Sequence, residues 1–430
     1  MRRDPLGLLT ATAREYGDVA RLRIGSAKIF LLSHPELVRE VLVTRNRSFI
    51  KTRVMRRTRR LLGEGLLTSE GDLHLRQRRL AQPAFHRDRI AGYARTMVDD
   101  AARLADRWRD GEQLDVHREM MRLALGIAGK TLFGTDLSAA EAEEIGAALD
   151  AALRLFRRAL VPFADVVDAL PLPSNRRFYR TRGRLDGMIY RMIRQRRASA
   201  EDTGDLLSML LLARDAEADG GAMSDEQVRD EAVTLLLAGH ETTANALAWT
   251  WYLLARHPEA ERALHAEVDA VLGDRLPTVD DLPHLPLARA VLAESMRLFP
   301  PAWVISREAL EDLEIDGVRV PAGAMVFLSE WVIHRDPRFW EEPERFLPER
   351  WLDGLAERLP RFAYFPFGGG PRMCIGEAFA WTEGTLVLAT LARHWRLRLL
   401  PGQRIEPLPL ITLRPRHGIG VRAERRGVTG

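Results

Sequence analysis

Cysteine and lysine are the residue types that this 430-residue chain uses most sparingly. Cysteine occurs once, at Cys374, which excludes an internal disulfide and fits a reducing compartment. Lysine occurs only at positions 28, 51 and 130, so nearly all of the 64 basic residues are arginines. The chain contains no run of 18 or more apolar residues and does not open with a charged-then-apolar leader. We therefore expect a soluble, cytoplasmic protein without a membrane anchor.

Arginines gather in two short clusters, at Arg53–Arg60 and Arg191–Arg197, although the net charge is only +4. We interpret each cluster as a solvated helix face. A docking patch for an acidic protein partner is the functional alternative. Nucleic-acid binding is disfavoured, because aromatic residues are not interleaved with the arginines.

The order of expected elements predicts a mainly α protein with a minor β part. Asp18–Leu32 alternates around a glycine like a hairpin, and Ser33–Glu36 matches a capping box at a helix start. Residues 70–300 are helical in pattern, with breaks at Pro162, Pro171–Pro173 and Asp219–Gly221. Short strands return at Leu313–Phe327 and Leu397–Val421. The length favours two domains, but the motifs described below spread over the whole chain, so we expect a single domain over residues 1–430.

The longest expected helix runs from Ser224, where Gln227 completes a capping box, to His257. It would be roughly 50 Å long at 1.5 Å per residue. Its apolar middle contains Gly239–Thr243, which places a glycine and an ionisable glutamate inside a helix core. A mid-helix glycine costs about 1 kcal/mol relative to alanine, and a buried carboxylate costs more. The segment therefore indicates a functional site, with a solvated notch or a kink as the alternative.

The lone cysteine has the surroundings of a metal ligand rather than of a spare core thiol. Cys374 follows a glycine-rich stretch and precedes an expected helix, and Arg372 adds a cation nearby. Glycines let backbone N–H groups approach a sulfur, and a helix N-terminus favours the thiolate form. We therefore expect Cys374 to bind a metal as a thiolate.

This loop resembles the haem-binding signature of the cytochrome P450 family, Phe-Gly-x-Gly-x-Arg-x-Cys-x-Gly. Every position of the signature is filled here, by Phe367, Gly368, Gly370, Arg372, Cys374 and Gly376. The resemblance implies the cytochrome P450 fold, with haem b between a long distal helix and the cysteine loop. It also implies that Cys374 is the proximal thiolate ligand of the iron and that Phe367 covers the thiolate.

The glycine segment of the long helix is not a zinc-protease motif, because Ala244 stands where the second histidine is needed. The segment resembles instead the distal-helix pattern of the P450 family, through Ala238, Gly239, Glu241, Thr242 and Thr243. The resemblance implies that Ala238 and Gly239 leave room for dioxygen and that Thr242 donates a hydrogen bond to it. Glu241, where the family more often has aspartate, would relay protons from solvent.

Two further motifs of the family are present downstream. Glu294 and Arg297 are spaced i, i+3 on one expected helix face, a spacing that alone is usual for surface ion pairs. The following Leu298–Pro301 and the later Pro343–Phe346 resemble the family's Glu-x-x-Arg helix and second arginine motif. The resemblance implies a buried structural network of Glu294, Arg297 and Arg345 that supports the cysteine loop.

The resemblance also assigns binding groups for the haem propionates and the substrate. His74 and Arg78 match the family's histidine-form helix motif, and Arg307 and Arg372 occupy further propionate positions. An ordinary surface histidine and a solvated basic helix are the structural alternatives for the first two. By family position, a mostly apolar substrate pocket is lined by Leu237, Ala302, Val304, Ile305, Leu410 and Ile411.

Together these motifs imply a monooxygenase that inserts one oxygen atom of O2 into a hydrophobic small molecule. Terpenoids, fatty acids, steroids and polyketides all fit the apolar pocket. Two electrons would come from a separate ferredoxin or flavodoxin-type donor and its reductase, docked on the cysteine-loop face. One alternative is a haem-thiolate peroxygenase or isomerase that does not activate O2, although such relatives tend to lose the acid–alcohol pair. A non-catalytic haem-binding sensor is the second alternative, disfavoured because the chain carries no output domain.

Overall fold

The computed structural model describes residues 4–25, 27–158, 167–168, 170–199, 202–215 and 221–427. In it 58% of the chain is helical and 13% lies in strands, which confirms the mainly α prediction. The chain divides into two compact units, one formed by residues 1–52, 97–123 and 242–430, the other by 53–96 and 124–241. The prediction of a single domain is not tested by this division. Among the described helices, none combines the length and apolarity needed to cross a membrane.

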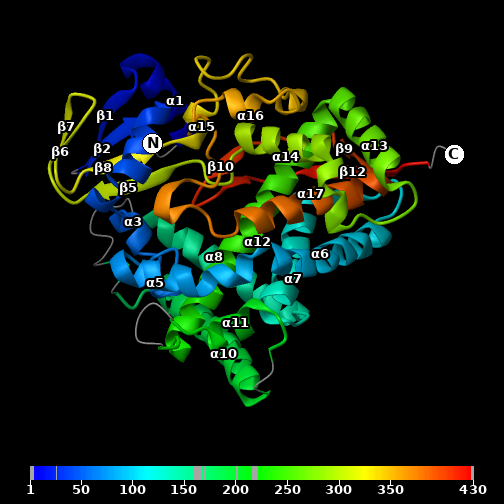
Figure 1. Cartoon of the computed structure of the whole chain (residues 1–430), viewed down its shortest axis with the longest axis horizontal. Coiled ribbons are helices and arrows are strands. Elements are labelled where there is room, and N and C mark those ends of the chain that lie inside the picture. The colour runs from blue at the N-terminus through cyan, green and yellow to red at the C-terminus, as the bar shows by residue number, and fades with distance from the viewer. Residues whose placement is uncertain are drawn as a thin grey trace. The chain divides into compact units, whose positions relative to one another are not determined.

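The first unit contains all the sheets found among the described residues. Its strands are β1 (Val19–Ile24), β2 (Ala27–Leu32), β3 (Phe49–Ile50), β4 (Gln113–Asp115), β5 (Ile305–Ala309), β6 (Leu313–Ile315), β7 (Val318–Val320), β8 (Met325–Leu328), β9 (Trp395–Leu399), β10 (Pro407–Pro409), β11 (Leu413–Pro415) and β12 (Gly420–Arg425). The largest sheet has the order β1-β2-β8-β5-β3, and Figure 1 shows β1, β2, β8 and β5 side by side. The predicted hairpin is confirmed, with β1 antiparallel to β2 and Val19 opposite Leu32.

Strand β2, inside the five-stranded sheet, is buried on both faces. Successive residues of β2 alternate between two apolar clusters, with Phe30 and Leu32 in one and Ile29 and Leu31 in the other. This is the alternation expected of a strand whose side chains point to opposite faces. The helices of this unit are α1 (Pro5–Tyr16), α2 (Pro35–Arg39), α13 (Pro258–Leu272), α14 (Pro286–Leu298), α15 (Glu330–Ile333), α16 (Leu355–Arg358) and α17 (Glu377–His394).

The second unit is built from helices, namely α3 (Arg53–Arg56), α4 (Arg59–Leu62), α5 (Gly71–Ala81), α8 (Ala139–Arg158), α10 (Pro173–Ser199) and α11 (Leu206–Leu212). Helices α6 (Arg87–Arg107), α7 (Val116–Phe133) and α12 (Asp225–Arg256) contribute residues to both units. The predicted break at Pro171–Pro173 is confirmed, because α10 begins at Pro173. The breaks predicted at Pro162 and Asp219 lie outside the described residues.

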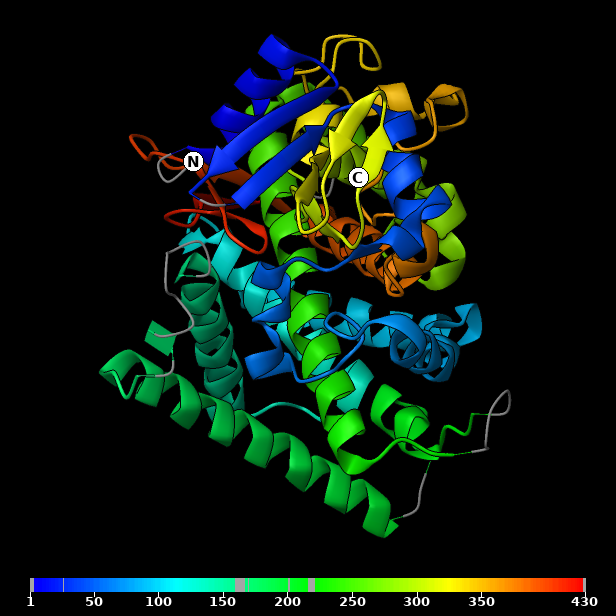
Figure 2. The ribbon, with the colours of Figure 1, turned by 90° about the vertical axis from the view of Figure 1, so that its left-hand side faces the viewer.

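The prediction of the longest helix is confirmed. Helix α12 is 32 residues long and runs unbroken in Figure 2. Its capping box is formed, since the Ser224 N–H donates to Gln227 Oε1 at 3.0 Å and the Gln227 N–H donates to Ser224 Oγ at 3.2 Å. The capping box predicted at Ser33 is wrong. His34 is the N-cap of α2, and its Nδ1 accepts the Glu36 N–H at 3.3 Å, because proline at position 35 takes the first helical place.

Candidate functional site

The loop that carries Cys374 is fixed by its own backbone. The Cys374 N–H donates to the Phe367 carbonyl at 2.9 Å. Gly370 has a φ of +67°, and a Cβ at this position would overlap the Leu42 carbonyl, so the loop requires glycine here. The Cys374 thiol is exposed and precedes the first residue of α17, Glu377, by three positions. A helix N-terminus generally favours a nearby thiolate, and the thiolate form of Cys374 stays a prediction.

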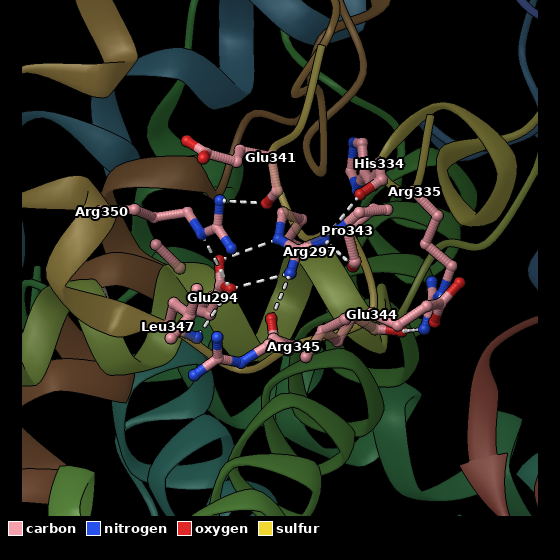
Figure 3. A network of polar contacts seen from close by, with 12 residues as sticks. Glu294, Arg297, His334, Arg335, Glu341, Pro343, Glu344, Arg345, Leu347 and Arg350 are labelled. Atoms are coloured by element: carbon pink, nitrogen blue, oxygen red, sulfur yellow. Dashed lines mark hydrogen bonds and ion pairs between the residues drawn. The ribbon is translucent and has the colours of Figure 1, made fainter. Parts of the chain in front are cut away.

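A buried ion pair lies between α14 and the 3-10 helix that follows Leu347. Arg297 donates to both carboxylate oxygens of Glu294 at 2.8 Å, and neither side chain is exposed (Figure 3). Glu294 also accepts hydrogen bonds from the Leu347 N–H at 3.0 Å, Arg350 Nε at 3.2 Å and Trp351 Nε1 at 2.9 Å. Five donors therefore satisfy one carboxylate, and we call these residues the Glu294 cluster.

The prediction that the Arg345 side chain joins this cluster is wrong. Its guanidinium is 63% exposed and pairs with Glu342 at 2.5 Å, and only its backbone carbonyl accepts a hydrogen bond from Arg297. Arg350, which is 12% exposed, takes the predicted place (Figure 3). The sequence Pro-Glu-Arg occurs twice, at 343–345 and 348–350, and the 3-10 helix turns the second arginine toward Glu294.

The Glu294 cluster is linked to the cysteine loop through His334. Arg297 Nη1 donates to the His334 carbonyl at 2.9 Å, and His334 Nε2 accepts the Phe365 N–H at 3.1 Å. The Phe365 carbonyl in turn accepts the Gly368 N–H at 2.8 Å. Burial, with the nearby Arg297 and Arg335, lowers the pKa of His334 well below its usual value, so the ring is neutral and Nε2 can accept. A continuous path of hydrogen bonds thus connects the Glu294 cluster to the cysteine loop.

The predicted site segment of α12 contains partly exposed residues within an otherwise buried stretch of the helix. Ala238, Gly239 and Thr242 are partly exposed, whereas Glu241 and most of their neighbours along the helix are buried. Positions 238, 239 and 242 share one helix face at 3.6 residues per turn. Apart from the adjacent residues and the nearby backbone of the helix itself, no described atom lies within 4 Å of the place that a Cβ would take at Gly239. The helix therefore keeps one small, open face, with a threonine hydroxyl on it.

Sequence reasoning missed Glu383, a buried carboxyl group on α17. Glu383 is 2% exposed and forms a hydrogen bond with Thr243 of α12. Burial raises its pKa to about 8, although the hydrogen bond with Thr243 opposes the shift. Glu383 is therefore protonated at neutral pH. The available signal was its place in an otherwise apolar stretch after Trp381, but the sequence does not say which neighbour it faces.

Two segments predicted to line a substrate pocket are joined by hydrogen bonds. Trp303 Nε1 donates to the Leu410 carbonyl at 2.9 Å, and the Leu413 N–H donates to the Pro301 carbonyl at 2.9 Å. Trp249 Nε1 of α12 donates to the Leu413 carbonyl at 3.0 Å. The predicted lining residues of these segments are all partly exposed, namely Ala302, Val304, Ile305, Leu410 and Ile411. Leu237, the sixth, is buried in the other unit.

The predicted propionate groups lie on regular elements. On α5, His74 is buried and Arg78 is partly exposed, while the neighbouring Arg76 and Arg79 are ion-paired with Asp215. His74 and Arg78 share one face of the helix at i, i+4 spacing. In the other unit, Arg307 is a partly exposed residue of β5, and Arg372 is partly exposed in the cysteine loop.

Comparison with known proteins places these features in one family. The family profile described as "Cytochrome P450" matches residues 2–419. The chain is 44% identical to "Cyclooctatin synthase" and 42% identical to "Cyclooctat-9-en-7-ol 5-monooxygenase", both of Streptomyces melanosporofaciens. The alignments cover 96% and 95% of this chain and 90% and 91% of the relatives. A third relative, "Pentalenene oxygenase" of Streptomyces avermitilis, is 37% identical over 96% of this chain and 91% of its own.

A solved structure agrees with these sequence relatives. The crystal structure of the cytochrome P450DA heme domain matches the fold with a TM-score of 0.89 at 29% sequence identity. The match covers 99% of this chain and 94% of that one.

Proposed function

Because the chain belongs to the cytochrome P450 family, we propose that its hydrophobic substrate is a terpene. The chain is a haem-thiolate monooxygenase that inserts one oxygen atom of O2 into a hydrophobic small molecule. Relatives of this chain modify terpenes, and their names specify pentalenene and cyclooctat-9-en-7-ol. The joined, apolar segments 301–305 and 409–413 support a substrate of this kind.

The residues of the chain fit a haem with a thiolate ligand. Haem b, when bound, activates O2 for insertion into the substrate. Cys374 would supply the thiolate, from an exposed position before a helix N-terminus and on a loop fixed by hydrogen bonds. Phe367 packs against Trp381, with ring centroids 5.6 Å apart, and would shield the sulfur from water.

The open face of α12, at positions 238, 239 and 242, is the main support for the proposed reaction with dioxygen. Thr242 would donate a hydrogen bond to dioxygen, and the missing side chain at Gly239 would leave the room that dioxygen needs. Splitting an O–O bond heterolytically requires protons delivered to the outer oxygen. Glu241 would relay these protons, and the protonated Glu383, hydrogen-bonded to Thr243, supports a second proton store close to the same helix.

The haem propionates would be bound by His74 and Arg78 of α5, by Arg307 of β5 and by Arg372. These groups provide the cationic and hydrogen-bonding chemistry that carboxylates require.

The electron donor would be an acidic ferredoxin that docks beside the cysteine loop. A surface hollow of about 350 Å³ there is lined by Leu282, Arg289, Glu377, Ala378, Trp381, Thr382 and Thr385. Arg289 stacks on Trp381, with Cζ 4.1 Å from the ring centroid. Thr385 Oγ1 is buried in the hollow without a hydrogen-bond partner in the described part of the chain. A carboxylate side chain of the donor would pair with the exposed Arg289. The cytoplasmic location stays a prediction.

Substitution of Thr242 by alanine tests the monooxygenase assignment of α12. With a terpene substrate and a ferredoxin system, the variant is expected to consume NADPH at a rate close to wild type. It should release most of the reducing equivalents as hydrogen peroxide instead of product. Thr250→Ala is the matched control, because Thr250 is buried in the same helix and its hydroxyl donates to the Ala246 carbonyl within that helix. Unchanged coupling in Thr242→Ala would contradict the role of Thr242.

Substitution of Arg289 by glutamine tests the docking site. The Michaelis constant for the ferredoxin should rise several-fold and the salt dependence of reduction should weaken, while substrate binding stays unchanged. Arg422→Gln, which removes an exposed arginine of β12, is the control with the same charge change. Equal effects of the two substitutions would exclude a specific contact at Arg289.

A further inference from the structure

Helix α10 has an unusual charge composition. Nine of its 27 residues are arginine, and Asp186 is its only acidic residue. Four of the nine arginines have carboxylate partners: Arg182 pairs with Asp186, Arg191 with Glu141, Arg196 with Asp205 and Arg197 with Asp225. The first pair lies within α10, and the other three join α10 to neighbouring segments. Five arginines of the helix take no part in these pairs.

The five remaining arginines form a single exposed stripe. All are exposed, and none has a carboxylate within ion-pair distance in the part of the chain that the structure describes; they are Arg176, Arg177, Arg180, Arg184 and Arg194. At 3.6 residues per turn they fall within an arc of about 100°, and they span about 27 Å along the axis. The buried residues of α10, such as Leu185 and Ile189, lie on the other side. We call these five residues the arginine stripe.

Like charges at i, i+4 repel each other and destabilise a helix. Arg176, Arg180 and Arg184 have this spacing and no intervening acid. The arginine stripe therefore lowers the stability of the folded helix. Attraction to a large, flat anionic surface would outweigh the repulsion between these arginines.

Apolar groups are exposed at the same end of the helix. Tyr179 is 51% exposed and Leu170 is 47% exposed. Leu170 is held at the start of α10, because Asn175 Nδ2 donates to its carbonyl at 2.9 Å. Tyrosine and leucine beside arginines are the combination found where a helix lies on a membrane interface, with rings at the headgroup level.

We propose that the arginine stripe binds the surface of an anionic lipid bilayer, with Tyr179 and Leu170 as shallow apolar anchors. Helix α10 is long and straight in Figure 2, so side chains along one of its faces can meet a flat partner together. Arginines near an anionic membrane surface attract it within a Debye length, and this needs no fixed geometry. Binding at the bilayer would bring the enzyme to a hydrophobic substrate that dissolves there.

Co-sedimentation with lipid vesicles tests this proposal. The probes are vesicles of equal parts phosphatidylglycerol and phosphatidylcholine, and vesicles of phosphatidylcholine alone. The wild-type holoenzyme should pellet with the first and not with the second, and added salt should release it. The variant Arg177→Gln, Arg180→Gln, Arg184→Gln should lose on the order of a hundredfold in partitioning.

The matched control is Arg87→Gln, Arg109→Gln, Arg422→Gln. It removes three exposed arginines outside the stripe and changes the net charge equally. This control should partition like wild type, and unchanged haem spectra would show that both variants fold. Tyr179→Ser should weaken binding severalfold without changing its salt dependence, because it removes an anchor and no charge.

Three results would overturn the proposal. The first is failure of the wild type to bind the anionic vesicles at low salt. The second is an equal loss of binding in the stripe variant and the control, which would show only a net-charge effect. The third is binding of duplex DNA, or of the acidic ferredoxin, through the stripe more tightly than the vesicles, which would assign the surface to another partner.

Discussion

Glu294 and Glu383 are both buried carboxyl groups on helices of the same unit, but their surroundings differ. Glu294 accepts five hydrogen bonds, two of them from the equally buried Arg297. Glu383 interacts with the Thr243 hydroxyl, and no cation of the described residues shifts its pKa. The first carboxyl is held in a buried ion pair, and the second is kept protonated by burial. The contrast separates a carboxylate that supports the fold from one that can hold a proton.

The largest effect is expected from breaking the Glu294 cluster. Arg297→Ala leaves a buried carboxylate with half of its charge compensation, which costs about 3–5 kcal/mol of unfolding free energy. Urea denaturation followed by circular dichroism measures this loss. Arg345→Ala is the control, and its denaturation midpoint should match wild type, because that guanidinium is exposed. A larger loss in Arg345→Ala than in Arg297→Ala would restore the original prediction.

The titration of Glu383 should make the free energy of unfolding depend on pH. Its pKa is about 8 in the folded protein and 4.5 as an unperturbed group. Between these values the folded state keeps a proton that the unfolded state releases, so a rise in pH favours unfolding. The stabilisation is complete below pH 4.5 and is lost as the pH rises to about 8. Wild type should lose on the order of 5 kcal/mol across this window, because each unit of pKa difference is worth about 1.4 kcal/mol.

Glu383→Gln provides the comparison for this measurement. Glutamine mimics the protonated carboxyl and does not titrate, so the variant should lack this part of the pH dependence. Urea midpoints at several pH values between 5 and 8.5 would compare the two proteins. Parallel curves for wild type and variant would show that Glu383 does not titrate in this range.

Arg350→Ala tests whether Arg350, rather than Arg345, belongs to the Glu294 cluster. Its effect on stability should be intermediate. The variant removes one charged donor and leaves Arg297 in place, so a loss of about 1.5–3 kcal/mol is expected. A double-mutant cycle with Glu294→Gln measures the coupling directly. Additive effects of the two substitutions would show that Arg350 and Glu294 do not interact.

Thr243→Val should have the smallest effect. The hydrogen bond with Thr243 lowers the pKa of Glu383, so its removal should shift the upper end of the pH window upward. The loss of stability at pH 6 should be about 1 kcal/mol, the usual net contribution of one hydrogen bond. A lower pKa of Glu383 in the variant would contradict a hydrogen bond between Thr243 and Glu383.

The sequence predicted those parts of the structure that depend on local pattern. The capping box of α12, the hairpin Val19–Leu32 and the helix after Cys374 all follow from residues close in sequence. The choice between Arg345 and Arg350 was not local, because both follow the same Pro-Glu dipeptide. Only the path of the chain after α14 decides which guanidinium reaches Glu294.

The chemistry around Glu383 was also beyond sequence reasoning. A glutamate in an apolar helix signals an unusual environment but does not name its partner. The partner is Thr243, on a helix about 140 residues earlier in the chain, and the pairing depends on how α12 and α17 pack. The motif residues Cys374 and Thr242 were predicted because a family resemblance supplied the missing long-range information.

The central claim is that Cys374 binds the haem iron as a thiolate. The absorption spectrum of the reduced protein with carbon monoxide tests it most directly. Wild type should show the Soret band shifted far to the red, as thiolate-ligated haem does, and Cys374→Ser should lose that shift while the protein remains folded. Retention of the red-shifted band in Cys374→Ser would contradict the assignment of the ligand.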